Sequence, residues 1–344
     1  MIYDCFTFFN ELELLELRLN TLDKYVDYFV LSESTKTHKN DDKILYYEEN
    51  KNLFKKFNHK IIHIVVDKFP YKLEQWTIEN IQRNSIINGL KSCNDDDIIM
   101  ISDLDEIPRP EFIKKYYNKN KITALDSDFF NFYMNMYLKD YPWTHGTKVL
   151  SYKNLKSILD DEIIDYAIDN NVNEGTTLTK VRLYYGPKQE HISHAGWHFS
   201  YIGDMKRKLI KFHSQCEGGK HINEEFIKNL IDSRKFHDHE LVPVKLDSFF
   251  PKYLVRNKRK YAQFILSGKY KSLLVNLRKE NFFKQIFSVE NKNNHKILTI
   301  LGIKIKFRIA QNLARVERER ERERERERVI TLNNFKNKNY KKAA

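Results

Sequence analysis

Glycine and cysteine are scarce in this chain of 344 residues, which contains 10 Gly and 3 Cys. The glycines form no G-x-x-x-x-G-K-[ST] loop, no G-x-G-x-x-G turn and no G-x-S-x-G elbow, so phosphate binding through a glycine cradle is not expected. Cys5, Cys93 and Cys216 are widely spaced, and they form no C-x-x-C pair. This pattern favours neither a disulfide framework nor a zinc knuckle, and a reducing compartment is the expected setting.

Long hydrophobic runs are also missing, and the longest, such as Ile61 to Val66, have the length of strands. No window of about 18 apolar residues occurs, so we expect no transmembrane helix. Residues 1–10 lack the basic region of a secretory signal, and we interpret them as a first strand. The expected location is therefore the cytoplasm.

Aromatic residues are plentiful, with 23 Phe, 20 Tyr and 3 Trp, so the chain is able to build a sizeable core. Charge is distributed unevenly. Residues 251–344 contain 26 Lys and Arg against 8 Glu, a net charge of +18, whereas residues 1–250 contain 34 Lys and Arg against 39 Asp and Glu, a net charge of −5. A basic tail on a mildly acidic body predicts a polyanionic partner, either a nucleic acid or the anionic inner face of the cell membrane.

Hydrophobic periodicity predicts the organisation of the chain. Helical spacing occurs in residues 11–23 and 74–91, and strand-like runs occur at 2–9, 26–32, 61–66 and 97–102. This alternation predicts an α/β fold with a mostly parallel sheet flanked by helices. We expect a catalytic domain over residues 1–267, a basic amphipathic extension over 268–316, and a disordered tail over 317–344 that begins with six Glu-Arg dipeptides.

An acidic motif, Ser102-Asp103-Leu104-Asp105-Glu106, follows a short apolar run that has the pattern of a buried strand. Asp103 and Asp105 are two residues apart, so in an extended chain both carboxylates point the same way. Two such carboxylates repel each other unless a cation lies between them. Mn²⁺ or Mg²⁺ suits these oxygen ligands and is able to bridge a diphosphate. The motif therefore predicts a metal site, and a surface cluster of acids is the alternative interpretation.

Other polar residues are candidates for binding the phosphates or the nucleotide of a ligand. Arg18 and Arg83 each carry a planar fork that suits a diphosphate, and a structural ion pair is the alternative for both. Asp4 and Glu11 flank the first strand, where a nucleotide would lie in an α/β fold. Three histidines, His191, His194 and His198, occur within eight residues and are candidates for a metal shell or a phosphate site; burial in the aromatic core is the alternative.

Five segments in this order resemble glycosyltransferase family 17. They are DCFTFFNELELLELRLNTL at 4–22, SESTKTH at 32–38, SDLDEIPRP at 102–110, HAGWHFSYIGD at 194–204 and FFPKYLVRNKRKYAQFIL at 249–266. The resemblance covers roughly residues 1–267. It implies a GT-A-like, Rossmann-type fold, an inverting transfer that depends on a divalent metal, a nucleotide-sugar donor such as UDP-GlcNAc, and a glycan or lipid-linked acceptor.

The resemblance also implies roles for single residues. Asp103 and Asp105 match the metal-binding acids of the family, and His194, Trp197 and His198 match its HAGWH segment. Inversion needs a general base that takes the proton of the acceptor hydroxyl. Four glutamates are the candidates for this base: Glu106, Glu174, Glu190 and Glu217.

Three competing functions are compatible with some of these residues. A nucleic-acid-binding protein would use the basic tail, but the acidic body carries no RNA-binding signature, so no nucleic acid is expected as a partner. A metal-dependent phosphohydrolase would use Asp103 as nucleophile and Asp105 as acid, but no matching Lys and second acid pair follow. An inactive relative that only binds glycans is the third, and the presence of both Asp103 and Asp105 argues against it.

Overall fold

The computed structural model describes residues 1–38, 40–69, 77–160, 177–183, 189–203, 224–236, 238–274, 287–292, 295–300 and 303–308. The chain forms two compact units, Met1–Leu273 and Leu274–Ala344. The boundary expected near Gly268 lies five residues before this division. The further boundary expected at residue 317 lies outside the described residues.

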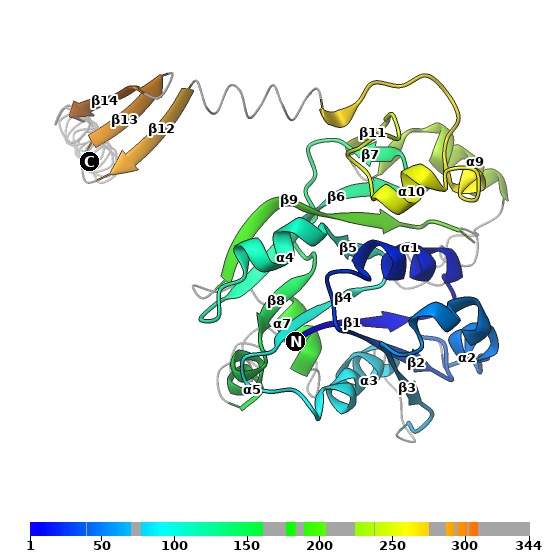
Figure 1. Cartoon of the computed structure of the whole chain (residues 1–344). Coiled ribbons are helices and arrows are strands. Elements are labelled where there is room, and N and C mark those ends of the chain that lie inside the picture. Colours follow the sequence, from blue (N-terminus) through cyan, green and yellow to red (C-terminus); the bar gives the residue numbers. More distant parts are fainter. Residues whose placement is uncertain are drawn as a thin grey trace, which may run out of the picture. The chain divides into compact units, whose positions relative to one another are not determined.

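The first half of the large sheet is parallel, with strand order β3-β2-β1-β4 (Figure 1). Its elements are β1 (Ile2–Phe8), α1 (Leu12–Leu22), β2 (Tyr28–Ser34), α2 (Tyr46–Asn50), η1 (Lys51–Phe57), β3 (Ile61–Val66), α3 (Thr77–Ser85), η2 (Ile86–Leu90) and β4 (Ile98–Asp103). Strands buried on both faces are continuously apolar, as the runs in this half are. The same order begins the doubly wound folds that bind dinucleotides. The predicted α/β fold class is confirmed.

The second half of the sheet is mixed, and it continues from β4 in the order β8-β6-β7-β11-β10, while β9 pairs with β6 and β5. Its elements are β5 (Glu106–Pro108), α4 (Pro110–Tyr116), β6 (Ile122–Asn131), β7 (Met136–Leu138), β8 (Lys148–Ser151), α5 (Tyr152–Asp160), α7 (Thr177–Leu183), β9 (Gln189–Ser200), α9 (Glu224–Asp232), β10 (Lys235–Phe236), β11 (His239–Pro243), α10 (Lys252–Arg256) and η3 (Ala262–Phe264). β8 is antiparallel to both β4 and β6, and β9 is parallel to β6. The carboxyl ends of β1, β4, β6 and β9 therefore lie at one edge of the sheet.

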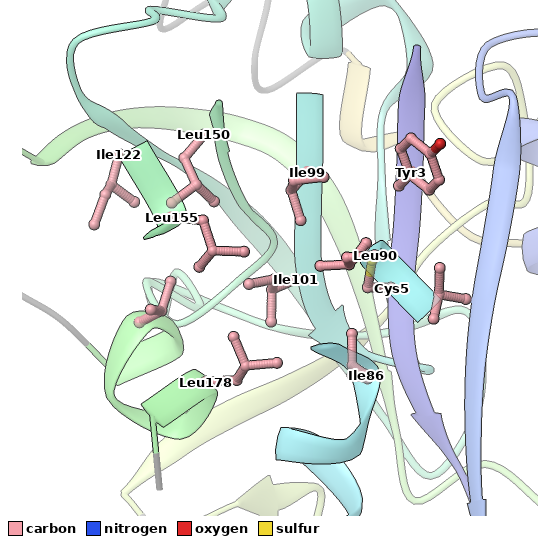
Figure 2. Close-up of a cluster of buried hydrophobic side chains, with 12 residues drawn as sticks. Tyr3, Cys5, Ile86, Leu90, Ile99, Ile101, Ile122, Leu150, Leu155 and Leu178 are labelled. Atoms are coloured by element: carbon pink, nitrogen blue, oxygen red, sulfur yellow. The ribbon is translucent and has the colours of Figure 1, made fainter. Parts of the chain in front are cut away.

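Helices cover both faces of the parallel half. On one face, buried side chains of η2, α5 and α7 pack against β1, β4 and β8 (Figure 2). Ile99 and Ile101 of β4 belong to this core and are fully buried. Each such burial contributes about 1.5–3 kcal/mol, so the strand that ends at Asp103 is firmly anchored. α1 packs on the other face, where Arg18 meets Asp4 and the ring of Phe6.

The second unit contains a small antiparallel sheet, with strand order β12-β13-β14. Its strands are β12 (Phe287–Lys292), β13 (His295–Ile300) and β14 (Ile303–Arg308). This part of the basic extension, for which no element type was predicted, is thus extended chain. Within the described residues, no helix has both the length and the apolar character that crossing a bilayer requires.

Candidate active site at the carboxyl edge of the sheet

A sharp turn joins β4 to β5, and this segment carries Asp103, Asp105 and Glu106. The guanidinium group of Arg18 binds the backbone of this turn. Arg18 Nη1 donates hydrogen bonds to the backbone carbonyl oxygens of Asp103 (3.0 Å), Leu104 (3.1 Å) and Glu106 (2.9 Å). Because these three carbonyls converge on one nitrogen, the backbone path of the turn is fixed by Arg18.

Arg18 is in turn held by Asp4 of β1. Its Nε and Nη2 donate to the two carboxylate oxygens of Asp4 at 2.8 and 2.6 Å, and Nη2 also donates to Ser102 Oγ at 2.7 Å. Arg18 and Asp4 are both 0% exposed. Arg18 was expected either to bind a diphosphate or to form a structural ion pair, and Asp4 to lie near a nucleotide; the structure shows the ion pair, in which the two side chains bond to each other and to the turn.

Asp103 is bound by two arginines from the helices on the opposite face of the sheet. Arg83 Nη2 of α3 lies 2.8 Å from Asp103 Oδ1, and Arg182 Nη2 of α7 lies 2.7 Å from Oδ2. Burial opposes ionisation of this carboxyl, but Arg182 and Arg83 outweigh it and hold the pKa of Asp103 below its ordinary value. Asp103 is therefore a carboxylate at neutral pH.

Glu106 is fully buried beside Asp103, and protein donors occupy both of its oxygens. Oε1 accepts from Arg182 Nη2 at 2.5 Å and from Trp143 Nε1 at 2.6 Å, and Oε2 accepts from the backbone N–H of Asp103 at 2.9 Å. Burial raises the pKa of Glu106 despite the neighbouring Arg182. The structure thus uses this candidate base to hold the turn and Arg182 in place.

Asp105 has the less restrained carboxylate of the two aspartates, because within the part of the chain that the structure describes it has only His198 as an ion-pair partner, where Asp103 has two arginines. His198 of β9 directs Nε2 toward Asp105 Oδ2, at 3.5 Å. The imidazole packs against the rings of Phe129 and Trp143, with centroid distances of 4.5 and 4.6 Å, and these two rings also stack on each other. Its buried Nδ1 has no hydrogen-bond partner among the described residues. Of the predicted HAGWH residues, His198 is therefore the one that the structure brings to the acidic turn.

The other predicted residues of β9 point elsewhere. Trp197 donates from Nε1 to the carbonyl oxygen of Phe249 at 3.0 Å, on the opposite face from His198, as strand alternation requires. His194 Nδ1 contacts Asp128 Oδ1 at 2.6 Å, and His191 Nδ1 contacts Asp126 Oδ1 at 2.8 Å. These two histidines pair with β6 and do not face Asp105.

The remaining candidates lie in different places. Glu11 lines a cleft at the same carboxyl edge of the sheet. Glu190 pairs in register with Thr123 near the start of β6. It is eight residues from His198, about 26 Å along a strand, so the structure does not bring it to the acidic turn. Glu174 and Glu217 lie outside the described residues.

The ion pairs and hydrogen bonds around the acidic turn form a charged network. Three residues that take part in it were not predicted from the sequence: Glu79, Trp143 and Arg182. Glu79 Oε1 accepts from Arg83 Nη2 at 2.7 Å, and its spacing of four residues from Arg83 on a helix is a signal that predicts this pair. No sequence pattern marks Trp143 or Arg182, because each reaches Glu106 through the tertiary fold. Together the network holds five carboxylates, on Asp4, Glu79, Asp103, Asp105 and Glu106, against three guanidinium groups, on Arg18, Arg83 and Arg182.

Two solved structures have a distant likeness to this chain. The crystal structure of 4-diphosphocytidyl-2C-methyl-D-erythritol synthase has a TM-score of 0.34 at 10% identity and covers 61% of this chain and 97% of its own. An active-site mutant of LgtC also has a TM-score of 0.34 at 10% identity and covers 78% of this chain and 98% of its own. Neither likeness supports a functional assignment.

Sequence similarity to curated proteins is limited to part of the chain. The β-1,4-mannosyl-glycoprotein 4-β-N-acetylglucosaminyltransferases of Homo sapiens and Rattus norvegicus are each 29% identical to it over 118 residues. The alignment covers 31% of this chain and 22% of each relative, so the chain matches about a fifth of the length of these relatives.

The sequence profile of glycosyltransferase family 17 matches residues 1–153. This region includes the parallel half of the sheet, the clamp of Arg18 and Asp4, and the turn that carries Asp103 and Asp105. The resemblance that the motifs suggested is confirmed over residues 1–153, which are similar to glycosyltransferase family 17, and the segments at 194–204 and 249–266 lie beyond this match.

Proposed function

We propose that this chain is a metal-dependent, inverting glycosyltransferase that moves a sugar from a nucleotide-diphosphate donor to a glycan or lipid-linked acceptor. The observation that carries the proposal is the acidic turn: two carboxylates at the carboxyl edge of a sheet, clamped by Arg18 and flanked by Arg83 and Arg182. Ligands of open α/β sheets bind at this edge.

The residues present fit a divalent cation. The carboxylates around the turn outnumber the guanidinium groups that bind them, and in the described part of the chain Asp105 has only His198 as an ion-pair partner, an arrangement that suits a divalent cation such as Mn²⁺ or Mg²⁺. Among the described residues, no three His, Cys, Asp or Glu side chains form a metal cage. Mg²⁺ is commonly held by one or two carboxylates plus the phosphates of a substrate. Asp105 would supply one of those carboxylates, and Asp103 would supply the other through the lone pairs that its two arginine contacts leave open. His198 lies beside Asp105 to orient it or to act as a further ligand.

A bound metal would stabilise the negative charge on the leaving nucleotide diphosphate. The protein's own contribution is positional. Arg18 keeps the turn in one conformation, and Glu106 holds Arg182 against Asp103. Arg83 and Arg182 fix the orientation of the Asp103 carboxylate through contacts at 2.8 and 2.7 Å.

The charged network argues against a phosphohydrolase. In that mechanism Asp103 would attack phosphorus with a free carboxylate oxygen. Here Arg83 binds Oδ1 and Arg182 binds Oδ2, and both contacts are shorter than 3 Å. An aspartate held in this way is stabilised as a charge and is a poorer nucleophile.

The names of the relatives support a proposal for the donor sugar and the acceptor. Their names specify transfer of N-acetylglucosamine to a β-1,4-mannosyl glycoprotein. We propose UDP-GlcNAc as the donor of this chain, and a glycan or a lipid-linked saccharide as its acceptor. Glu174 and Glu217 remain the proposed bases, because Glu106 is occupied and Glu190 is distant.

The test of the proposed function is donor cleavage by the full chain. We expect Mn²⁺-dependent release of nucleoside diphosphate from one member of a panel of nucleotide sugars, and we expect EDTA to abolish it. Release of nucleoside diphosphate that persists in EDTA would contradict the proposed dependence on a metal. A chain that is folded by circular dichroism but binds no nucleotide sugar with Mn²⁺ in a calorimeter would contradict the proposal as a whole.

We also propose that the basic tail docks the enzyme on the inner face of the cell membrane. Each Lys or Arg near an anionic surface contributes about 1 kcal/mol. We expect the full chain to sediment with phosphatidylserine vesicles at low salt and to release at high salt, whereas a chain ending at Leu273 stays in solution. Equal binding of both chains, or binding to neutral vesicles, would contradict the docking.

A further inference from the structure

A cleft of about 510 Å³ opens at the carboxyl edge of the sheet, beside the acidic turn, and its volume lies in the range of small-molecule sites. Its lining comes from four parts of the chain: the end of β1 with the start of α1, the end of β6, the end of β9, and η3. The lining residues are Asn10, Glu11, Glu13, Leu14, Phe132, Tyr133, Ile202, Gly203, Gln263 and Phe264.

The cleft lies close to the acidic turn. Thr7 of β1 pairs in register with Asp103 of β4. β1 ends at Phe8, and Asn10 of the cleft lining follows shortly after it, next to the strand that ends at Asp103. This neighbourhood suits a second substrate that meets the donor at the turn.

The outer wall of the cleft is firmly built. It belongs to the segment 249–266, one of the five that resemble the family and one to which no role was assigned from the sequence. Tyr253 Oη and Lys260 Nζ both bond to Glu16 of α1, at 2.9 and 2.6 Å. At the other end, the backbone N–H of Met134 donates to the carbonyl oxygen of Phe264 at 2.8 Å. These bonds hold Gln263 and Phe264 in place at the cleft.

The floor of the cleft carries an unusual backbone. Phe132 follows β6 with φ of 66°, and Tyr201 follows β9 with φ of 56°. A bulky residue in this left-handed region costs about 1–3 kcal/mol, and such conformations cluster at functional sites. The turn at Phe132 leads directly to Tyr133, which lines the cleft. A hydrogen bond joins the ends of β6 and β9: the N–H of Phe132 donates to the carbonyl oxygen of Ser200 at 3.2 Å.

The chemistry of the lining favours a neutral sugar. It contains no Lys or Arg and two carboxylates, Glu11 and Glu13, so a diphosphate would be repelled. No described residue donates a hydrogen bond to the Glu13 carboxylate. A saccharide would bond its hydroxyl groups to carboxylate and amide oxygens and would pack its C–H face on the aromatic rings of Tyr133 and Phe264.

We propose that this cleft binds the acceptor saccharide. The inference rests on the proposed function, because it assigns the second substrate of the same transfer. Glu13 bonds sugar hydroxyls, Tyr133 and Phe264 supply the ring faces, and the donor occupies the neighbouring turn with Asp105. Glu11, which we predicted to bind the cofactor, then belongs to the acceptor side.

The test is saccharide binding by the full-length protein on a printed glycan array, with nucleotide-sugar affinity measured in parallel by calorimetry. We expect the wild type to be retained by at least one saccharide. Glu13→Gln and Tyr133→Ala should weaken retention about tenfold or more, the loss expected when a hydrogen bond to a charged acceptor is removed. Donor affinity should stay unchanged in both variants.

Two further variants serve as controls. Tyr133→Phe keeps the ring and should retain most saccharide binding, and Tyr25→Ala removes an exposed aromatic ring outside the cleft lining and should change nothing. Thermal melting curves show whether each variant is folded. The inference is overturned by a wild type that binds donor but no saccharide, by cleft variants with full saccharide binding, or by cleft variants that lose donor affinity instead. A wild type that binds no nucleotide sugar would instead overturn the proposed function.

Discussion

Asp105→Asn is expected to lower the rate of metal-dependent donor cleavage by about a hundredfold to a thousandfold. The substitution keeps the size of the side chain and removes its charge, so the proposed metal loses its less restrained carboxylate. Loss of one preorganised electrostatic partner of the transition state typically costs this much. The measurement is the rate of nucleoside diphosphate release with saturating Mn²⁺.

The fold should survive this substitution, because Asp105 is partly exposed and only its 3.5 Å contact with His198 is affected. We therefore expect an unchanged melting temperature. Asp95→Asn is the matched control: its side chain is 55% exposed, pairs with Lys156 and precedes β4 at the opposite edge of the sheet. Full activity of Asp105→Asn, or an equal loss in Asp95→Asn, would contradict the assignment of Asp105.

Arg18→Met is expected to lower the free energy of unfolding of the first unit by about 3–5 kcal/mol. The variant leaves the buried Asp4 carboxylate without its bidentate partner. It also removes the donor that three turn carbonyls share. Thermal denaturation followed by circular dichroism measures the loss, and the remaining folded protein should cleave donor more slowly, because the turn is no longer held.

Two variants separate this buried clamp from an ordinary ion pair. Lys51→Met breaks a surface pair with Glu48, where both side chains are about half exposed, and should cost less than about 1 kcal/mol. Arg18→Lys keeps the charge but not the fork, and should lie between the wild type and Arg18→Met. Arg18→Met with wild-type stability would show that the clamp is dispensable.

The parallel half of the fold and the acidic turn were predictable from local patterns. Strands β1 and β3 were expected within one residue of their bounds, because short runs rich in apolar, β-branched and aromatic residues mark strands. The position of Asp103 and Asp105 followed from the end of such a run. The mixed half gave no comparable signal, since its aromatic residues are neither continuous nor periodic.

The role of each polar residue was much harder to predict. Arg18 has the sequence signature of a phosphate-binding residue and of a buried clamp alike, because burial depends on what α1 packs against. In the HAGWH segment, His194 has φ of 56° and lies inside the register shift of β6 with β9, between the pairs Leu125–Ile192 and Ser127–Gly196. This irregularity turns His194 toward Asp128 and leaves His198 facing Asp105. Spacing in the sequence does not reveal such a bulge.

The family match ends at residue 153, but the charged network does not. Arg182 binds both Asp103 and Glu106, and His198 lies beside Asp105. A fragment limited to the matched region would leave Glu106 buried with one cationic neighbour fewer and would lack the strand that pairs with β5. Residues 1–153 are therefore not expected to fold as an independent unit. A chimera that joins them to another carboxyl-terminal half would have to supply a substitute for α7 and β9.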